Sequence, residues 1–353
     1  MATITAPGVY VLEEDPGPRP IESVGTNIAA FLGVAPASEE RLQEIVPVTN
    51  WTEFRKHFVD PASDDGQRPP STDLTRAVAG FFQNGGGLCL VVNLGADPAP
   101  NAVTEALRLL EARDEVSILA APGMADPATH EALIGHCEIL QDRFVILDPA
   151  GAVDDTADLL TVATSAAPRP RSSSSSSSSA SSSDSSPSDA EESDDADATA
   201  PPATPRIGKP RETESAAYYY PRIGVTDPLD GTLTITPPSG HIAGVYARVD
   251  ERRGVHKAPA NEPIVGAITL EDFVTKAEQG PLNAAGVNVI RSFPRQGIRI
   301  WGARTLAPAG PNIYVNVRRL VIMIKESIEE GTMWVVFEPN DYRLWKSITR
   351  DAT

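Results

Sequence analysis

The chain has 353 residues, of which 41% are hydrophobic and 32 are proline, so it can form two or three domains with part of its length outside them. It contains two cysteines and no run of the about 20 apolar residues that a bilayer span needs, and Met1–Tyr10 lacks the basic and apolar regions of a secretory signal. These features argue against a membrane protein, a disulfide-framed secreted scaffold and a metal-cluster protein.

The net charge of −18 is unevenly distributed along the chain. It amounts to −16 over residues 1–163, −5 over residues 164–205 and +3 over residues 206–353. We expect the acidic part to face water and the slightly basic part to face other protein. Because no segment carries clustered Lys and Arg, nucleic-acid binding is disfavoured.

The N-terminus predicts an extended arm. Residues 6–14 have the pattern of a short strand, and four of the six residues in 15–20 are proline or glycine, which disfavours helix. A strand separated from its domain in this way has no local partner, and an unpaired strand edge must be paired or covered. It either folds back on its own sheet or is donated to another subunit. The candidate inter-subunit residues are Val9, Tyr10, Val11 and Leu12.

A folded block is predicted from Thr26 to Leu160. Its hydrophobic runs and periodicity predict strands at 28–35, 88–92, 116–120 and 144–147, and helices at 74–82, 102–112 and 127–140. Strands that alternate with helices are typical of a parallel α/β sheet covered on both faces.

Low-complexity sequence follows this block. Residues 172–179 are all serine and are followed by a run rich in aspartate and glutamate, so the segment cannot bury enough apolar area to offset its ordering entropy. We expect residues 164–205 to be a disordered linker. The sheet-like runs at 216–221 and 223–225 indicate that the chain then returns to the same domain.

The last part of the chain is denser in predicted elements. Strands are expected at 297–301, 313–317 and 334–337, and a helix with one apolar face carries Val317, Leu320, Val321, Ile324 and Ile328. Asn340 is predicted to cap a final helix that contains Leu344, Trp345 and Ile348. That helix is only about three turns long when the sequence stops at Thr353, so the chain looks shortened within an element.

No catalytic constellation emerges from the residues. Gly85-Gly86-Gly87 precedes a strand instead of opening a helix and lacks a following Lys-Ser/Thr, so it reads as a turn and not as a phosphate loop. Ser239-Gly240-His241 lacks a Gly-x-Ser-x-Gly elbow, and adjacent residues cannot by themselves form the geometry of a nucleophile and its base.

Metal and cofactor sites are not expected either. The five histidines include neither His-x₃-His nor His-Glu-x-x-His, and His130 and His136 fall on different faces of one predicted helix. Cys89 and Cys137 lie in apolar runs, as small buried hydrophobes do. Asp148, Asp154 and Asp155 follow a predicted strand and read as a solvated loop.

Several long strings of residues carry a family resemblance. They are Asn27–Ala35, Phe81–Gly86, Pro237–Arg248, Gly254–Glu262, Gly297–Leu306, Tyr314–Arg319 and Trp334–Asp341. Together they closely resemble the tail sheath protein of contractile phages and of phage-derived contractile injection systems. The resemblance covers nearly the whole chain outside the serine-rich segment.

The resemblance implies a fold, a set of domains and partners. The expected fold is α/β, with a parallel-sheet domain of subtilisin-like topology that lacks a protease triad and an α+β C-terminal domain. The implied division is 1–25 for the donated arm, 26–163 and 206–250 for the two parts of the α/β domain, 164–205 for the linker, and 251–353 for the conserved C-terminal domain. The implied partners are further copies of the chain in stacked hexameric rings, an inner tube protein, and baseplate and terminator proteins, with no cofactor, nucleic acid or inserted membrane segment.

Two departures from the family stand out. Family members usually continue past the last helix with a C-terminal arm, so this chain is either shortened or assembles without one of the two linking arms. The Ser/Asp-rich tract occupies a place where sheath proteins often vary.

The expected function is that of a structural subunit of a contractile sheath, made in the cytoplasm and assembled into a virion tail or tail-like particle. The alternative is a diverged α/β hydrolase or nucleotide-binding protein, which the parallel sheet and the glycine turn would suit, although a fold alone does not imply activity. A display or adhesion protein built around the serine-rich stalk is a third possibility, but it requires export.

Overall fold

The computed structural model describes residues 21–37, 39–60, 70–99, 101–163 and 208–352. Within these ranges, nine strands form one large sheet in the order β2-β3-β1-β4-β5-β6-β11-β12-β9, and three form a small antiparallel sheet in the order β10-β7-β8. The six consecutive strands from β3 to β11 are parallel to their neighbours, while β2, β12 and β9 pair antiparallel at the two edges. The fold is therefore mixed α/β with a mostly parallel central sheet, as the sequence predicts.

The strands of the large sheet are β1 (Ala29–Gly33), β2 (Ile45–Val48), β3 (Cys89–Asn93), β4 (Ile118–Ala120), β5 (Phe144–Leu147), β6 (Ala216–Tyr220), β9 (Glu262–Pro263), β11 (Val287–Phe293) and β12 (Gly297–Ile300). Those of the small sheet are β7 (Ile223–Thr226), β8 (Leu233–Thr236) and β10 (Ala267–Leu270). The helices are α1 (Trp51–Phe58), α2 (Asp73–Gln83), α3 (Ala102–Leu110), α4 (Pro127–Leu140), α5 (Ser239–Arg253), α6 (Lys276–Ala284), α7 (Val315–Thr332) and α8 (Tyr342–Asp351), with short 3₁₀ turns η2 (Thr156–Leu160) and η3 (Met333–Val335).

Helices cover both faces of the large sheet. The side chains of β1 alternate between two cores. Phe31 packs into the core under α1, α2 and α5, and Leu32 packs into the core under α3, α4 and α6. Side chains of successive strand residues point to opposite faces, so a strand between two helical layers is buried on both. The helix α2 begins with a capping box, since the Thr72 side chain accepts a hydrogen bond from the Thr75 amide.

The helices α2 and α5 pack at unusually close range. An ideal Cβ built on Gly240 would lie 2.4 Å from the backbone of Ala77, and one built on Gly244 would lie 2.4 Å from the Phe81 carbonyl oxygen. A side chain at either position would push the two helices apart. This approach holds α5 against the sheet and buries it almost entirely.

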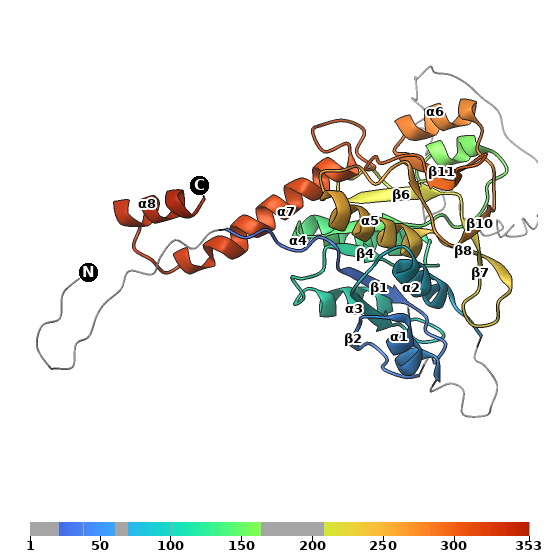
Figure 1. Cartoon of the computed structure of the whole chain (residues 1–353), viewed down its shortest axis with the longest axis horizontal. Helices are drawn as coiled ribbons and strands as arrows, with labels where there is room; N and C mark the ends of the chain where they lie inside the picture. Colours follow the sequence, from blue (N-terminus) through green and yellow to red (C-terminus); the bar gives the residue numbers. More distant parts are fainter. Residues whose placement is uncertain (1–20, 38, 61–69, 100, 164–207, 353) are drawn as a thin grey trace, which may run out of the picture.

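Three predictions for the C-terminal region are wrong. Residues 315–317 are the first turn of α7 and not the end of a strand, and 334–337 holds η3 and a turn in place of a buried strand. The segment 334–337 lies on the projecting arm, away from both sheets, so its β-branched residues have no strand to pair with in the described structure (Figure 1). The last helix is present, but Asp341 caps it instead of Asn340.

Candidate assembly interface

The helix α7 leaves the body of the protein and carries α8 beyond it (Figure 1). Its first turns are anchored by Arg319, whose guanidinium donates to both carboxylate oxygens of Asp250 at 3.1 and 2.7 Å and lies 4.8 Å from the ring centroid of Tyr246. Both charged side chains are about 95% buried. A buried bidentate pair fixes the direction of α7 because either partner alone would be an unpaired buried charge.

An extended segment at residues 21–28, which we call the strap, runs along α7 (Figure 1). The Val24 amide donates to the Ser327 hydroxyl at 3.1 Å, and the Thr26 hydroxyl donates to Asp250 at 2.7 Å. Near its start, the Ile21 amide lies 3.4 Å from the Asp351 carbonyl oxygen at the end of α8. The strap therefore joins the two ends of the described chain on one projecting element.

The outer part of this projecting element exposes many apolar side chains. They are Ile324, Ile328, Met333, Val336, Phe337, Tyr342 and Trp345. Phe337 is 98% exposed and Trp345 is 56% exposed. Concentrated aromatic residues and methionine at a surface are typical of protein–protein contacts, and large exposed apolar patches are rare on monomers. This arm is the candidate assembly interface.

The sequence-predicted inter-subunit residues Val9, Tyr10, Val11 and Leu12 lie outside the described residues. Their proposed role stays a prediction. The strap begins at Ile21, directly after the residues that the structure does not describe, and lies on α7. The sequence did not predict the strap, because nothing in residues 21–27 indicates a strand or a helix.

The Ser239-Gly240-His241 string is structural. The Ser239 amide donates to Asp148 Oδ1 at 2.8 Å and its hydroxyl donates to Oδ2, so Asp148 caps the first turn of α5. In the described structure the Ser239 hydroxyl meets a carboxylate and not an imidazole, which is not the arrangement of a nucleophile and its base. His241 is buried between α2 and α5 against Gly80, and burial lowers its pKa to about 4.

One prediction about the acidic residues is wrong. Asp148 is 2% exposed, and burial raises its pKa to about 7 although both Ser239 hydrogen bonds lower it. It is thus a buried cap and not part of a solvated loop. Asp154 and Asp155 are exposed as predicted, and Asp155 caps η2.

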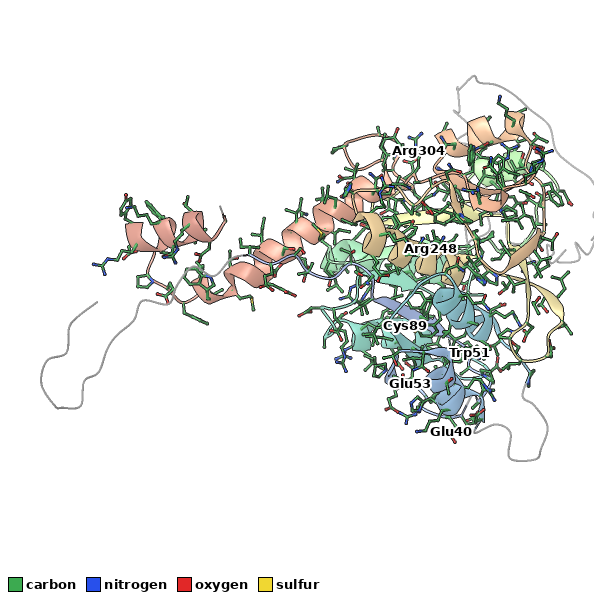
Figure 2. All side chains as sticks on the ribbon, viewed as in Figure 1. Glu40, Trp51, Glu53, Cys89, Arg248 and Arg304 are labelled. Carbon is green, nitrogen blue, oxygen red and sulfur yellow. The ribbon has the colours of Figure 1, made fainter. Side chains whose placement is uncertain are left out.

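The glycine turn does not form a phosphate cradle. The Arg248 guanidinium donates to the Asn84 carbonyl oxygen at 3.1 Å, and an ideal Cβ on Gly85 would lie 2.9 Å from the Arg248 side chain. Arg248 therefore packs over the turn. Figure 2 marks its place on α5. Cys89 lies in the interior on the following strand, and Cys89 and Cys137 are free, buried thiols whose pKa values burial raises.

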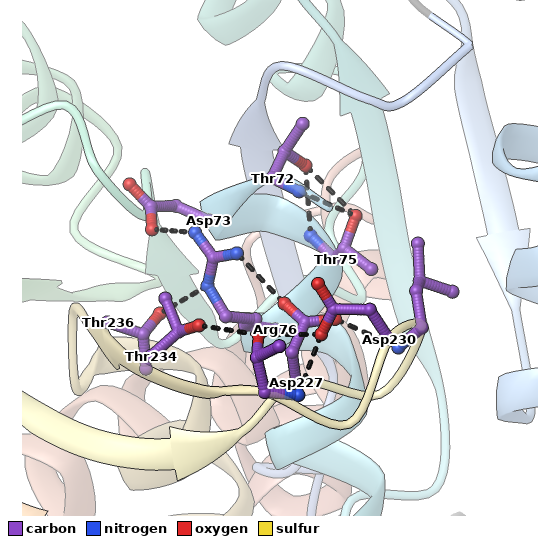
Figure 3. A network of polar contacts seen from close by, with 10 residues as sticks. Thr72, Asp73, Thr75, Arg76, Asp227, Asp230, Thr234 and Thr236 are labelled. Carbon is purple, nitrogen blue, oxygen red and sulfur yellow. Dashed lines mark hydrogen bonds and ion pairs between the residues drawn. The ribbon is translucent and has the colours of Figure 1, made fainter. Parts of the chain in front are cut away.

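A polar network ties α2 to the small sheet (Figure 3). Arg76 donates to Asp227 at 3.0 Å and to Asp73 at 2.7 Å, and its Nε lies 3.4 Å from the Thr236 hydroxyl. The Asp227 side chain is 2% exposed, so this network is a structural clamp with a buried charge pair.

The described residues contain no cluster of three His, Cys, Asp or Glu side chains arranged to hold a metal ion. Among them, no helix is both long and apolar enough to cross a bilayer.

Comparison with known sequences gives a family for the region around α5. Residues 210–306 match the phage tail sheath protein central domain. The tail sheath protein of Burkholderia phage BcepMu is 30% identical over 142 residues, which cover 38% of this chain and 30% of that protein. The tail sheath protein of Escherichia phage P2 is 26% identical over 126 residues, covering 34% and 31%. The chain thus matches about a third of the length of these curated relatives.

Comparison with solved structures extends over the whole chain. The helical sheath of the anti-feeding prophage (AFP) in its contracted state is 26% identical, with a TM-score of 0.69, over 99% of this chain and 82% of that one. The contracted sheath complex of the extracellular contractile injection system PVC shares the fold at 23% identity, with a TM-score of 0.70, over 99% and 80%. The mixed sheet and its projecting arm therefore have the fold of these contractile sheath subunits. The chain is thus similar to phage tail sheath proteins, and its residues 210–306 match the central domain of that family.

Proposed function

We propose that the protein is a subunit of a contractile sheath that surrounds an inner tube and shortens to drive the tube through a target envelope. The observation that carries this proposal is the projecting arm, on which α7, the turn that follows it and α8 expose seven large apolar side chains between Ile324 and Trp345. A single copy has no described surface that covers them. The likeness to the AFP sheath over almost the entire chain supports the same assignment.

The projecting arm, formed by α7 and α8, suits repeated contacts between identical copies. A head-to-tail contact that does not close into a ring builds a filament, and strand addition supplies main-chain hydrogen bonds that persist while rigid bodies rotate. We propose that residues 9–12 donate such a strand, with the Pro-rich stretch at 15–20 as the hinge. Contraction would then convert a long, kinetically stable packing into a shorter one, with a small gain per subunit that sums over many copies.

The proposed partners follow from this role. They are further copies of the chain in stacked hexameric rings, an inner tube protein, and baseplate and terminator proteins. The division at residue 250, with 251–353 nearest the tube, stays a proposal that rests on the family resemblance and on the +3 charge of residues 206–353.

Deletion of Ala2–Pro20 tests the donated arm. Negative-stain microscopy of the deletion variant should show single subunits or short, disordered aggregates where the full chain forms tubes. A matched control removes the eight serines at 172–179 and should form tubes like the full chain. Ordinary contractile tubes from the arm-deletion variant would contradict the proposal.

A further inference from the structure

A pocket of about 150 Å³ lies where the strap and α7 meet the body. Its floor is apolar and includes Ile28, Phe144, Ile322 and Met323. Its position in the fold is well defined, because Ile28, Ser117 and Phe144 stand at the amino ends of β1, β4 and β5. The pocket therefore opens at the edge of the parallel sheet where the strands begin.

Carboxylates surround this pocket without enough cations to balance them. Its lining includes Asp114, Glu115, Asp142, Glu326 and Glu330. Arg319 also lines it, but its guanidinium is held by Asp250 and by the Thr26 carbonyl oxygen. Within the described structure, Glu115 lies 3.7 Å from Arg113 and Asp142 pairs with Arg143, while Asp114, Glu326 and Glu330 make no ion pair.

The electrostatics of Glu326 reflect this excess of negative charge. Partial burial and the carboxylates of Asp142, Glu329, Glu330 and Asp114 raise its pKa to about 7. The neighbouring Lys325 points its ammonium to the Gln141 side chain at 3.1 Å. A pocket with an apolar floor and an unbalanced acidic rim suits a long side chain that ends in a cation.

The turn between β11 and β12 carries a side chain of this kind. Arg295 stands at the tip of the hairpin, is exposed, and makes no hydrogen bond or ion pair to any described residue. The hairpin from Val287 to Ile300 contains three arginines and no carboxylate. The rings of Phe293, next to the turn, and Trp301, which follows β12, pack together with centroids 4.5 Å apart, and the Arg291 guanidinium lies over Phe293.

The β11–β12 hairpin cannot reach the acidic pocket of its own chain, because the two lie at opposite edges of the sheet. Because β11 is parallel to β6 and so to β4 and β5, its end at Phe293 lies at the carboxyl edge of the sheet. The pocket lies at the amino edge. A contact between the hairpin of one copy and the pocket of another can therefore repeat head to tail, and where it does not close into a ring it builds an open assembly.

We propose that the β11–β12 hairpin of one copy docks into the acidic pocket of a second copy, with Arg295 placed between Asp114, Glu326 and Glu330. The aliphatic part of Arg295 covers Ile322 and Met323, and the planar guanidinium donates to the carboxylates. This inference rests on the proposed sheath function and names one contact between its subunits. The positively charged hairpin and the negatively charged pocket are complementary. Because every chain carries both, a second copy of the chain is the partner that we propose.

Disulfide trapping tests the contact directly. The only cysteines of the sequence, Cys89 and Cys137, are fully buried, so introduced thiols are the accessible ones. Chains with Arg295→Cys and chains with Glu326→Cys are mixed, assembled and oxidised, and we expect a covalent dimer that needs both variants. The control replaces Arg295→Cys with Lys276→Cys, an exposed cation on α6. A yield of disulfide-linked dimer no higher than in this control would overturn the proposal. The pocket would then be assigned to contact with a different protein.

Charge exchange provides a second test. Arg295→Glu and Glu326→Arg should each raise the concentration needed for assembly about tenfold, and the two together should restore it. Thermal unfolding checks that each variant is folded. Equal assembly of wild type and Arg295→Glu overturns the docking proposal alone, whereas a wild-type chain that forms no assembly with its native partner proteins contradicts the proposed function itself.

Discussion

The Ile21 amide and the Asp351 carbonyl oxygen lie 3.4 Å apart, although 330 positions separate them in the sequence. This contact places the strap and α8 side by side at the far end of α7. The start of the strap and the end of α8 therefore face the same surroundings. Movement of α7 would carry both together.

The anchor of α7 should be sensitive to loss of Arg319. Arg319→Met leaves Asp250 buried without its cation, and we expect a loss of about 3–5 kcal/mol in the free energy of unfolding. Urea denaturation followed by circular dichroism measures it. Arg343→Met, an exposed position on α8, is the control and should change stability by less than about 0.5 kcal/mol. Equal effects of the two substitutions would show that the pair does not anchor the helix.

The close packing of α2 and α5 predicts a penalty at Gly240. Gly240→Ala places a methyl group 2.4 Å from the Ala77 backbone, so the helices must separate, at a cost of about 1–3 kcal/mol or more. Gly135→Ala on α4 is the control, because its new methyl group meets no atom within 4 Å. Alanine has the better helix propensity, so this variant should stabilise the protein by up to about 1 kcal/mol. Differential scanning calorimetry should show shifts of opposite sign. A stabilised Gly240→Ala would refute this view of the interface.

The polar clamp of Figure 3 should be costly to break. Arg76→Leu leaves the buried carboxylate of Asp227 unpaired and should destabilise the protein by about 3–5 kcal/mol. The matched control is Arg55→Leu, because the Arg55–Asp60 pair is about half exposed on both sides and such pairs contribute less than about 1 kcal/mol. If the two variants unfold at the same denaturant concentration, the Arg76 pair has no special role.

The acidic pocket predicts a pH dependence in the unassembled subunit. Because the pKa of Glu326 is about 7 in the fold and near 4.5 when unperturbed, the folded protein binds a proton that the unfolded chain releases in this range. The contribution of Glu326 to the unfolding free energy therefore falls as pH rises from about 4.5 to about 7. Asp148, with a pKa of about 7, acts in the same direction, so a variant is needed to separate them.

Glu326→Gln supplies that separation. At pH 8 it should stabilise the subunit by about 1 kcal/mol, a value reduced for the partial exposure of the side chain, and at pH 4 it should have little effect. Thermal unfolding across this pH range measures the difference. The exposed Glu338→Gln serves as the control. A gain at pH 4 equal to that at pH 8 would contradict an electrostatic origin.

Much of the sheet could be predicted because its signals are local. The run Ala29–Gly33 is hydrophobic throughout, as a strand buried on both faces must be, and Thr72 carries its own cap signal. The sequence did not predict helix α5, because the interactions that stabilise it are not local. Gly240 and Gly244 have poor helix propensity, and the helix is stabilised by its contact with α2, which no single sequence displays.

The candidate interface shows the limit of sequence patterns most clearly. The apolar stripe that contains Ile324 and Ile328 predicts a helix face that must be covered, and the helix is present, but both side chains are almost half exposed. Periodicity indicates that a partner is needed and cannot tell whether that partner belongs to the same chain. The strand predicted at 334–337 is wrong for the same reason, since a hydrophobic run does not by itself show that the residues are buried within one chain.

Electron microscopy of the particle isolated from its native host tests the central claim most directly. We expect this chain in stacked rings around an inner tube, with the projecting arm of each copy covered by its neighbours. A particle in which the chain is a solitary subunit with its α7–α8 arm in solvent, at a resolution that identifies the helices, would contradict the account.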